Sequence, residues 1–165
     1  MELLVVRHAI AFEPDARRWP DDADRPLSPR GIARASRAAA GLKRLTERPV
    51  QVLSSPLHRA LETAAILTRF AGWPEAAACD ELRPGVASDA LLARLARVRG
   101  ERIALIGHQP GLGRLIAACV PGSAAPAAFA LKKMSVGLLG FPGAVRAARG
   151  ELLWLLPPKV MRAAG

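Results

Sequence analysis

The stretch from Glu2 to His8 constrains the fold of this chain more than any other. A short apolar run there ends abruptly in two strongly polar residues. Leu3–Val6 is wholly apolar and ends in two valines, a pattern typical of a strand buried on both faces. Arg7 and His8 follow it directly. Ligands of open α/β sheets bind just beyond the carboxyl ends of the strands, so this segment predicts a buried strand that brings a guanidinium and an imidazole to a binding site.

The alternation of strand and helix continues up to residue 120. Further strands are expected at 50–53, 76–79 and 102–106, and helices at 29–46, 55–70, 89–99 and 110–120, where apolar residues recur at helical spacing. This is the βαβ pattern of a parallel sheet with helices on both faces. We therefore predict an α/β fold, a three-layer α/β/α sandwich with a mostly parallel central sheet.

The last third of the chain changes character. A loop of small residues is expected at 121–128, and strands at 129–134, 135–141 and 151–156. These strands are predicted to add to the sheet in antiparallel fashion at an edge, and the tail after Pro158 is expected to be loose. The length of 165 residues suits one domain, so a single domain spanning residues 1–165 is predicted.

Composition limits the partners. The net charge of +10 comes mostly from arginine and favours anions: phosphates, nucleic acid or acidic proteins. Nucleic acid is disfavoured, because aromatic residues are few, none are interleaved with a basic run, and the arginines are scattered along predicted helices, which is typical of solvated faces. No apolar run reaches the roughly 18 residues of a membrane span. Cys79 and Cys119 lack CxxC spacing and are interpreted as reduced core thiols of a cytoplasmic protein.

Two serine–proline pairs and one long loop add detail. Ser28 with Pro29, and Ser55 with Pro56, are each predicted to cap a helix. The polar segment 9–26 is too long for an ordinary connection, and loops of that length are often functional.

Polar groups follow three of the predicted strands: Arg7 and His8, then the segment 54–59, then His108. Parallel strands bring these ends to one edge of the sheet. Helix N-termini expected at Ser55 and Gln109 would bind anions through backbone N–H groups, and guanidinium groups match phosphate oxygens. The sequence therefore predicts a phosphate pocket with an imidazole as nucleophile. The histidines lack short metal-ligand spacing, so neither a metal nor a cofactor is expected.

These residues carry a resemblance. Arg7-His8-Ala9 is similar to the Arg-His-Gly signature of the histidine phosphatase superfamily, although alanine stands where glycine is common. The segment 55–63 resembles that family's Ser-Pro-x-x-Arg-Ala-x-x-Thr motif, and Gly107-His108 resembles its second catalytic histidine. The segments 24–31 and 108–110 are most similar to the small SixA-type branch of phosphohistidine phosphatases. The resemblance covers nearly the whole chain and implies a phosphoglycerate mutase-like fold.

The resemblance implies that His8 attacks phosphorus and carries a phosphohistidine intermediate, which water then hydrolyses. Arg7, Arg59 and His108 would surround the phosphoryl oxygens and stabilise their charge. Neighbouring cations would keep His8 neutral and nucleophilic.

The general acid and the substrate contacts stay open at this point. Glu81 is the best match to the carboxylate that protonates the leaving group in larger relatives; Asp80 is a poorer match, and both could be solvated turn residues. Arg25 could contact substrate or pair with Asp24. Ser55 and Gln109 are expected to bind substrate.

The expected function is hydrolysis of phosphohistidine on a protein, such as a phosphorelay domain of the histidine phosphotransfer type, because no long insertion follows the third strand to form a lid. A small phosphoester is the alternative substrate, and mutase activity is disfavoured because it needs a closed site. A phosphate-binding module without activity and a basic nucleic-acid binder are alternatives of other classes.

Overall fold

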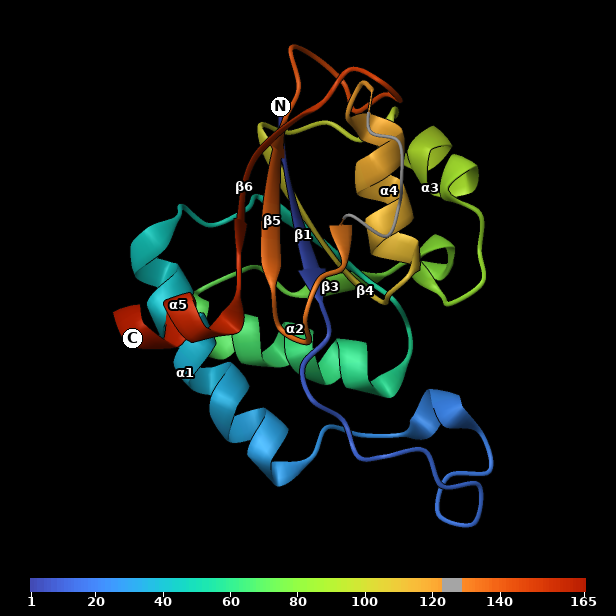
Figure 1. The fold of residues 1–165 in the computed structure, drawn as a ribbon, viewed down its shortest axis with the longest axis vertical. Helices are drawn as coiled ribbons and strands as arrows, with labels where there is room; N and C mark the ends of the chain where they lie inside the picture. Colours follow the sequence, from blue (N-terminus) through green and yellow to red (C-terminus); the bar gives the residue numbers. More distant parts are fainter. Residues whose placement is uncertain (123–128) are drawn as a thin grey trace.

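The computed structural model describes residues 1–122 and 129–165, which form a six-stranded sheet in the order β3-β2-β4-β1-β5-β6 with helices on both faces (Figure 1). The strands are β1 (Glu2–Arg7), β2 (Gln51–Ser54), β3 (Ala76–Ala78), β4 (Arg102–Gly107), β5 (Val136–Gly140) and β6 (Glu151–Leu156). The helices are α1 (Pro29–Leu45), α2 (His58–Ala71), α3 (Ser88–Leu95), α4 (Gly111–Cys119) and α5 (Pro158–Ala164), with short 3-10 helices η1 (Asp22–Asp24) and η2 (Asp80–Leu82).

The register of the parallel strands sets the position of the site. In the pair β1 and β4, Arg7 lies opposite Gly107, and in the pair β2 and β4, Ser54 lies opposite Ile106. The carboxyl ends of these three strands therefore lie at one edge of the sheet. β5 pairs with β1, and β6 with β5, in antiparallel fashion. The predicted α/β sandwich with antiparallel additions is confirmed.

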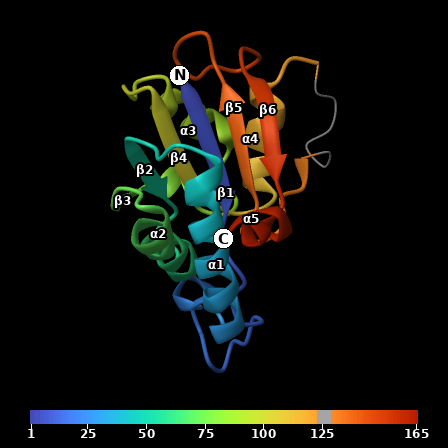
Figure 2. The same ribbon diagram turned by 90° about the vertical axis from the view of Figure 1, so that its left-hand side faces the viewer.

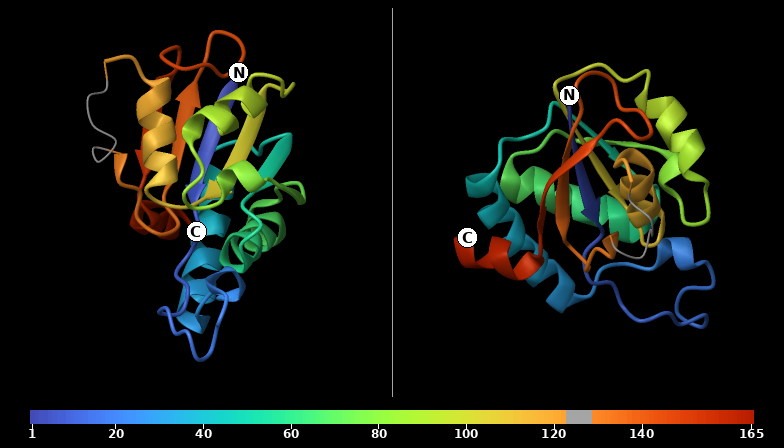
Figure 3. Two further views of the ribbon diagram at one scale, coloured as in Figure 1. Left: turned by 90° about the vertical axis from the view of Figure 1, so that its right-hand side faces the viewer. Right: turned by 45° about the horizontal axis from the view of Figure 1, so that its top comes forward.

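The sheet divides the core into two halves, which explains why β1 is wholly apolar. Leu4 and Val6 face α1, α2 and α5, whereas Leu3 and Val5 face α3 and α4. Both sets are fully buried, since each face of the strand is covered by helices. Figures 2 and 3 show the two helical layers from opposite sides.

The C-terminal tail packs on α1, on one face of the sheet. α1 begins where the sequence predicts, because the Ser28 hydroxyl accepts a hydrogen bond from Gly31 N–H at 3.0 Å. The sequence predicts a loose tail, and this prediction is wrong. The tail forms α5 and packs on α1. A Cβ at Gly41 would lie 1.7 Å from the Met161 carbonyl oxygen, so only glycine permits this close approach.

The predicted strand at 129–134 is wrong. Met134 adopts a left-handed φ of 67°, and its N–H donates to the Arg7 carbonyl at 3.0 Å. The Arg7 guanidinium in turn donates to the Leu131 carbonyl at 2.7 Å. These contacts fold the segment over the end of β1 instead of pairing it along an edge. Most of the loop predicted at 121–128 lies outside the described residues.

Within the described ranges, no helix has both the length and the apolar character that a membrane span requires.

Candidate active site

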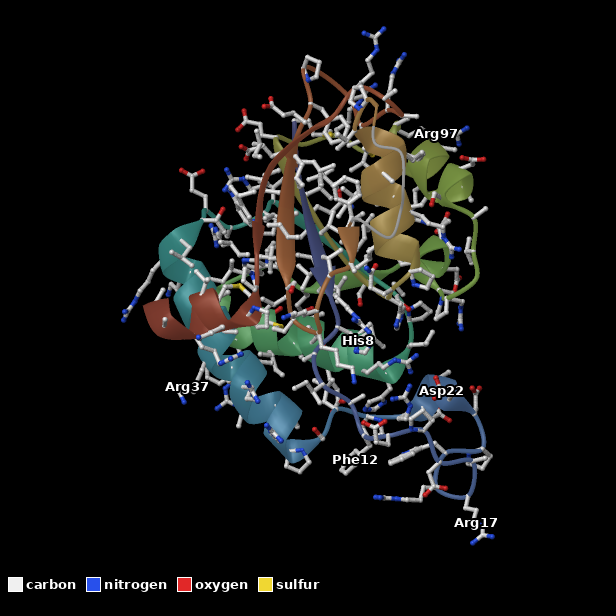
Figure 4. All side chains as sticks on the ribbon, viewed as in Figure 1. His8, Phe12, Arg17, Asp22, Arg37 and Arg97 are labelled. Carbon is white, nitrogen blue, oxygen red and sulfur yellow. The ribbon has the colours of Figure 1, made fainter. Side chains whose placement is uncertain are left out.

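Two histidines meet where β1 and β4 end. His8 follows β1 and His108 follows β4, and their ring centroids lie 5.0 Å apart. Both are nearly buried, with 7% and 5% of their surface exposed. Figure 4 shows His8 below the end of β1, next to α2. The sequence prediction that parallel strands bring these two imidazoles together is confirmed.

The backbone fixes the tautomer of His8. Its Nδ1 lies 2.7 Å from the Ala9 carbonyl oxygen, which can only accept, so Nδ1 must carry the proton. In a neutral imidazole the lone pair is then on Nε2. The Ala9 peptide is itself anchored to α2, because its N–H donates to Thr63 Oγ1 at 3.0 Å. The structure therefore leaves the lone pair of His8 on Nε2.

Arg59 brings a buried cation to the site from the first turn of α2. Only 4% of its surface is exposed. Its Nη1 donates to the Asp22 carbonyl at 2.8 Å, and its Nη2 lies 3.1 Å from an Asp22 carboxylate oxygen. Asp22 thus fixes the guanidinium and ties the 9–26 loop to α2.

Three buried donors around His8 lack partners. In the parts of the chain that the structure describes, the buried side-chain nitrogens without a hydrogen bond are Arg7 Nε, Arg59 Nε and His108 Nδ1. Buried polar atoms are nearly always bonded, and an exception points to a missing ligand or water. All three belong to residues that the sequence analysis assigned to phosphate. An anion with several acceptor oxygens is the ligand that would form hydrogen bonds with all three nitrogens.

The sequence predicts that Ser55 caps α2, and this prediction is wrong. The helix begins at His58, with Leu57 at the capping position, and Ser55 lies before it. Its hydroxyl instead lies 2.9 Å from Nε2 of His108 and accepts a bond from Leu57 N–H at 3.4 Å. A hydroxyl has a second lone pair as well as its proton, so this contact is compatible with either tautomer of His108. When the hydroxyl donates to Nε2, the proton of His108 is on Nδ1, where it is a donor for the site.

Burial and positive charge keep both imidazoles neutral. Burial is the main cause that lowers the pKa of His8 from 6.5 to about 4, and the charges of Arg59 and Arg7 lower it further. Burial likewise lowers the pKa of His108 to about 3, with His8 and Arg59 as the next contributions. At neutral pH Nε2 of His8 therefore has its lone pair available.

These shifts make stability depend on pH. The unfolded chain binds protons at both histidines below pH 6.5, whereas the folded chain binds them only near pH 4 and pH 3. The free energy of unfolding should therefore be unaffected by these groups above pH 6.5 and fall progressively below it. We expect a loss on the order of 2 kcal/mol per histidine at about pH 4.5, measured by urea denaturation.

A His108→Gln variant should lose about half of this dependence. His58→Gln is the control, because that side chain lies exposed on α2. An unchanged pH profile in His108→Gln would contradict the assignment.

Glu81 lies close to the site but is engaged elsewhere. It lines a small cavity of about 30 Å³ together with His108. Its carboxylate accepts hydrogen bonds from the Cys79 thiol at 3.2 Å and from Arg94 at 3.2 Å. Hydrogen bonds, first from its own backbone and then from Cys79, lower the pKa of Glu81. Asp80 is likewise paired, with Arg83 at 2.8 Å.

The other two predicted substrate contacts make bonds within the protein. Arg25 pairs with Asp22 at 2.6 Å and not with Asp24, and it also donates to the Phe12 carbonyl at 2.7 Å. Gln109 donates to the Phe129 carbonyl at 2.9 Å and accepts from Gly113 N–H at 2.8 Å. A role of either residue in substrate binding stays a prediction.

Asp22 is the site residue that the sequence analysis missed. It is one of three aspartates in the segment 21–24, and no spacing distinguishes it from its neighbours. Its contact with Arg59 depends on the path of the 9–26 loop. As for metals, no group of three or more histidine, cysteine, aspartate or glutamate residues in the described ranges could hold an ion.

Comparisons with known proteins agree with this geometry. A family model described as the histidine phosphatase superfamily, branch 1, matches residues 3–84. An uncharacterised protein of Picosynechococcus sp. (strain PCC 7002) is 33% identical over 163 residues, which cover 96% of this chain and 98% of that protein.

Solved structures are also similar in fold, among them the following two. The protein histidine phosphatase SixA complexed with tungstate is 24% identical with a TM-score of 0.83, covering 96% of this chain and 98% of that one. A candidate alpha-ribazole-5′-phosphate phosphatase from Escherichia coli K-12 is 19% identical with a TM-score of 0.73, covering 96% and 97%. The family model matches the segment that carries Arg7, His8 and Arg59, and the fold brings His108 to them. The chain therefore belongs to the histidine phosphatase superfamily, and it is an enzyme of the phosphatase class.

Proposed function

We propose that this enzyme hydrolyses phosphohistidine on a protein, through a phosphorylated His8 and without a metal. The observation that carries the proposal is the state of Glu81. Its carboxylate is bonded to Arg94 and Cys79 and its pKa is lowered, so at neutral pH it holds no proton to donate. A site without a strong general acid suits a substrate whose leaving group departs without help. The imidazole of phosphohistidine is such a group when solvent has protonated its second nitrogen, because it then leaves as a neutral molecule.

In the proposed mechanism, the substrate imidazole carries a proton from solvent on its other nitrogen. Nε2 of His8 attacks phosphorus in line, the bond between phosphorus and that imidazole breaks, and the imidazole takes the electron pair and leaves as a neutral molecule. Arg7 Nε–H, Arg59 Nε–H and His108 Nδ1–H, the three buried donors without partners, donate to the phosphoryl oxygens and stabilise their charge. Ser55 acts as a positioning residue, because it keeps the proton of His108 on Nδ1.

Water then attacks the phosphorus of the phosphorylated His8. Inorganic phosphate leaves, and the imidazole of His8 returns to its neutral state. The low pKa of His8 makes this neutral form the resting state of the enzyme.

The short connection after β3 supports a protein substrate. Only residues 79–87, which include η2, connect β3 to α3, so this connection has no long insertion to cover the site. A cytoplasmic location is proposed with this function, supported by the two unbonded cysteines, Cys79 and Cys119, which are both buried.

Glu81→Gln should test the absence of a general acid. We expect less than about a threefold loss of kcat/KM for a phosphohistidine peptide, since general acid catalysis is otherwise worth about 10²-fold or more. Asp80→Asn is the matched control on the same 3-10 helix. A loss of about 10²-fold in kcat/KM of the Glu81→Gln variant would show that Glu81 is the general acid.

The proposed function is tested by comparing leaving groups in the presence of a chelator. A phosphohistidine peptide, an aryl phosphate and an alkyl phosphate are hydrolysed in parallel, and released phosphate is measured. We expect turnover to survive the chelator and to fall in that order. Faster turnover of the alkyl phosphate would overturn the phosphohistidine assignment.

Small phosphoesters are the second candidate substrates. The similarity in fold to the E. coli structure named for a small phosphoester favours them, and the same comparison of substrates decides between the two.

A further inference from the structure

A basic hollow lies beside the catalytic histidine. It has a volume of about 370 Å³ and is lined by cations from four parts of the chain. We call it the basic hollow and define it by five cationic residues: Arg7, Arg34, Lys132, Lys133 and Arg162. Arg34 comes from α1, Arg162 from α5, and the two lysines from the segment that folds over the end of β1.

These cations face one another without compensation. The lining of the hollow contains no carboxylate, and Arg34, Arg162 and both lysines make no ion pair with any described residue. The pKa of Arg162 is lowered, first by burial and then by the charges of Arg34 and Arg37. Like charges held together in this way oppose folding unless an anion joins them. The arrangement is therefore typical of a surface that receives negative charge.

The rest of the lining is apolar and without aromatic rings. It consists of Ala9, Ile10, Gly31, Ala35, Met134 and Pro158. Proteins that bind single-stranded nucleic acid stack bases on aromatic side chains, and none is present here. Acidic side chains fit this lining, because their methylene groups can pack on the small and aliphatic residues while their carboxylates pair with the cations.

The hollow is continuous with the site. Arg7 belongs to both, Ala9 and Ile10 directly follow His8, and the charge of Lys133 contributes to lowering the pKa of His8. A phosphohistidine presented to His8 on a protein would therefore place its neighbouring residues against this surface.

We propose that the basic hollow binds aspartate or glutamate side chains next to the phosphohistidine of a protein substrate. This inference rests on the proposed function and adds a substrate class to it: phosphohistidine in an acidic surface. The charges would speed encounter and orient the substrate, whereas the transfer of the phosphoryl group would depend on the residues around His8.

The test compares two synthetic peptides that carry phosphohistidine flanked by glutamates or, at the same positions, by glutamines. We expect wild type to show about a tenfold higher kcat/KM for the glutamate peptide, from a few partly exposed ion pairs, and the preference to shrink at high salt. Arg34→Ala/Arg162→Ala should abolish the preference and leave turnover of an aryl phosphate unchanged. Arg97→Ala, an exposed arginine far from His8 in Figure 4, should keep it.

Lys132→Ala/Lys133→Ala is a second variant, in case the first one does not fold, and should reduce the preference as well. Equal turnover of both peptides by wild type would overturn the proposal. So would a preference that survives in both double variants.

Binding separates this inference from the proposed function. Fluorescence anisotropy with His8→Ala measures the affinity for each labelled peptide without turnover. Tighter binding of the glutamate peptide, with no hydrolysis of either peptide by wild type, would support the binding of acidic side chains in the basic hollow. The same result would contradict the proposal that the enzyme hydrolyses phosphohistidine. Tighter binding of a single-stranded DNA 12-mer than of the glutamate peptide at equal salt would overturn the assignment to an acidic protein.

Discussion

His8→Ala is expected to abolish turnover of every phosphorylated substrate, with a loss of at least about 10⁴-fold in kcat. The reason is that no other group can replace Nε2 of His8. The Ala9 carbonyl holds the proton on Nδ1, and the second imidazole, that of His108, is bonded through Nε2 to Ser55. The affinity for phosphate should change much less than the rate, because the arginines remain.

The measurement is a rapid-quench experiment with radiolabelled substrate, which traps the phosphorylated enzyme. Wild type should accumulate a label that is labile to acid and stable to alkali, and His8→Ala should not. His58→Ala, which removes an exposed imidazole from α2, should behave as wild type. A labelled enzyme in the His8→Ala variant would place the nucleophile elsewhere and disprove the mechanism.

Arg59→Ala is expected to lower kcat/KM by about 10³-fold, the range found when a cationic group that stabilises transferred phosphoryl is removed. Arg59 is almost fully buried, and its Nε has no partner among the described residues. Its positive charge therefore acts in a poorly solvated site, where it is worth more than in water. Removing it also leaves Asp22 without one of its two cationic partners.

Arg59→Lys separates charge from geometry. A lysine keeps the charge but cannot supply the planar set of donors, so we expect it to recover only part of the activity. Arg69→Ala is the matched control, because Arg69 is exposed on the same helix. Folding is checked by circular dichroism. A loss below about tenfold in folded Arg59→Ala would show that Arg59 does not contact the transferred group.

The local elements of this fold were predictable because their signals are local. A continuous apolar run such as 3–6 is stable only between two layers, and the structure buries Leu3, Leu4, Val5 and Val6 completely. Ser28 caps α1 through a bond within its own turn. The gathering of Arg7, His8 and His108 also followed from sequence, because parallel strands align their carboxyl ends.

The wrong predictions each involve a distant contact. Ser55 has the sequence of a helix cap, but His108 from a neighbouring strand end takes its hydroxyl. Residues 129–134 have the composition of a strand, but the bond from Arg7 to Leu131 folds them over the site. The tail becomes α5 because Gly41 allows it to approach α1.

The sequence by itself determined the sandwich, the edge of the sheet that holds the candidate site and its residues Arg7, His8, Arg59 and His108, since periodicity and strand direction are properties of short segments. Only the tertiary structure decided how those residues are held. It brought Asp22 to Arg59, gave Ser55 to His108 and engaged Glu81 with Arg94. It also gathered arginines and lysines that look scattered in sequence into one basic hollow. The physical reason is that these are contacts between side chains far apart along the chain, and their partners are set by packing.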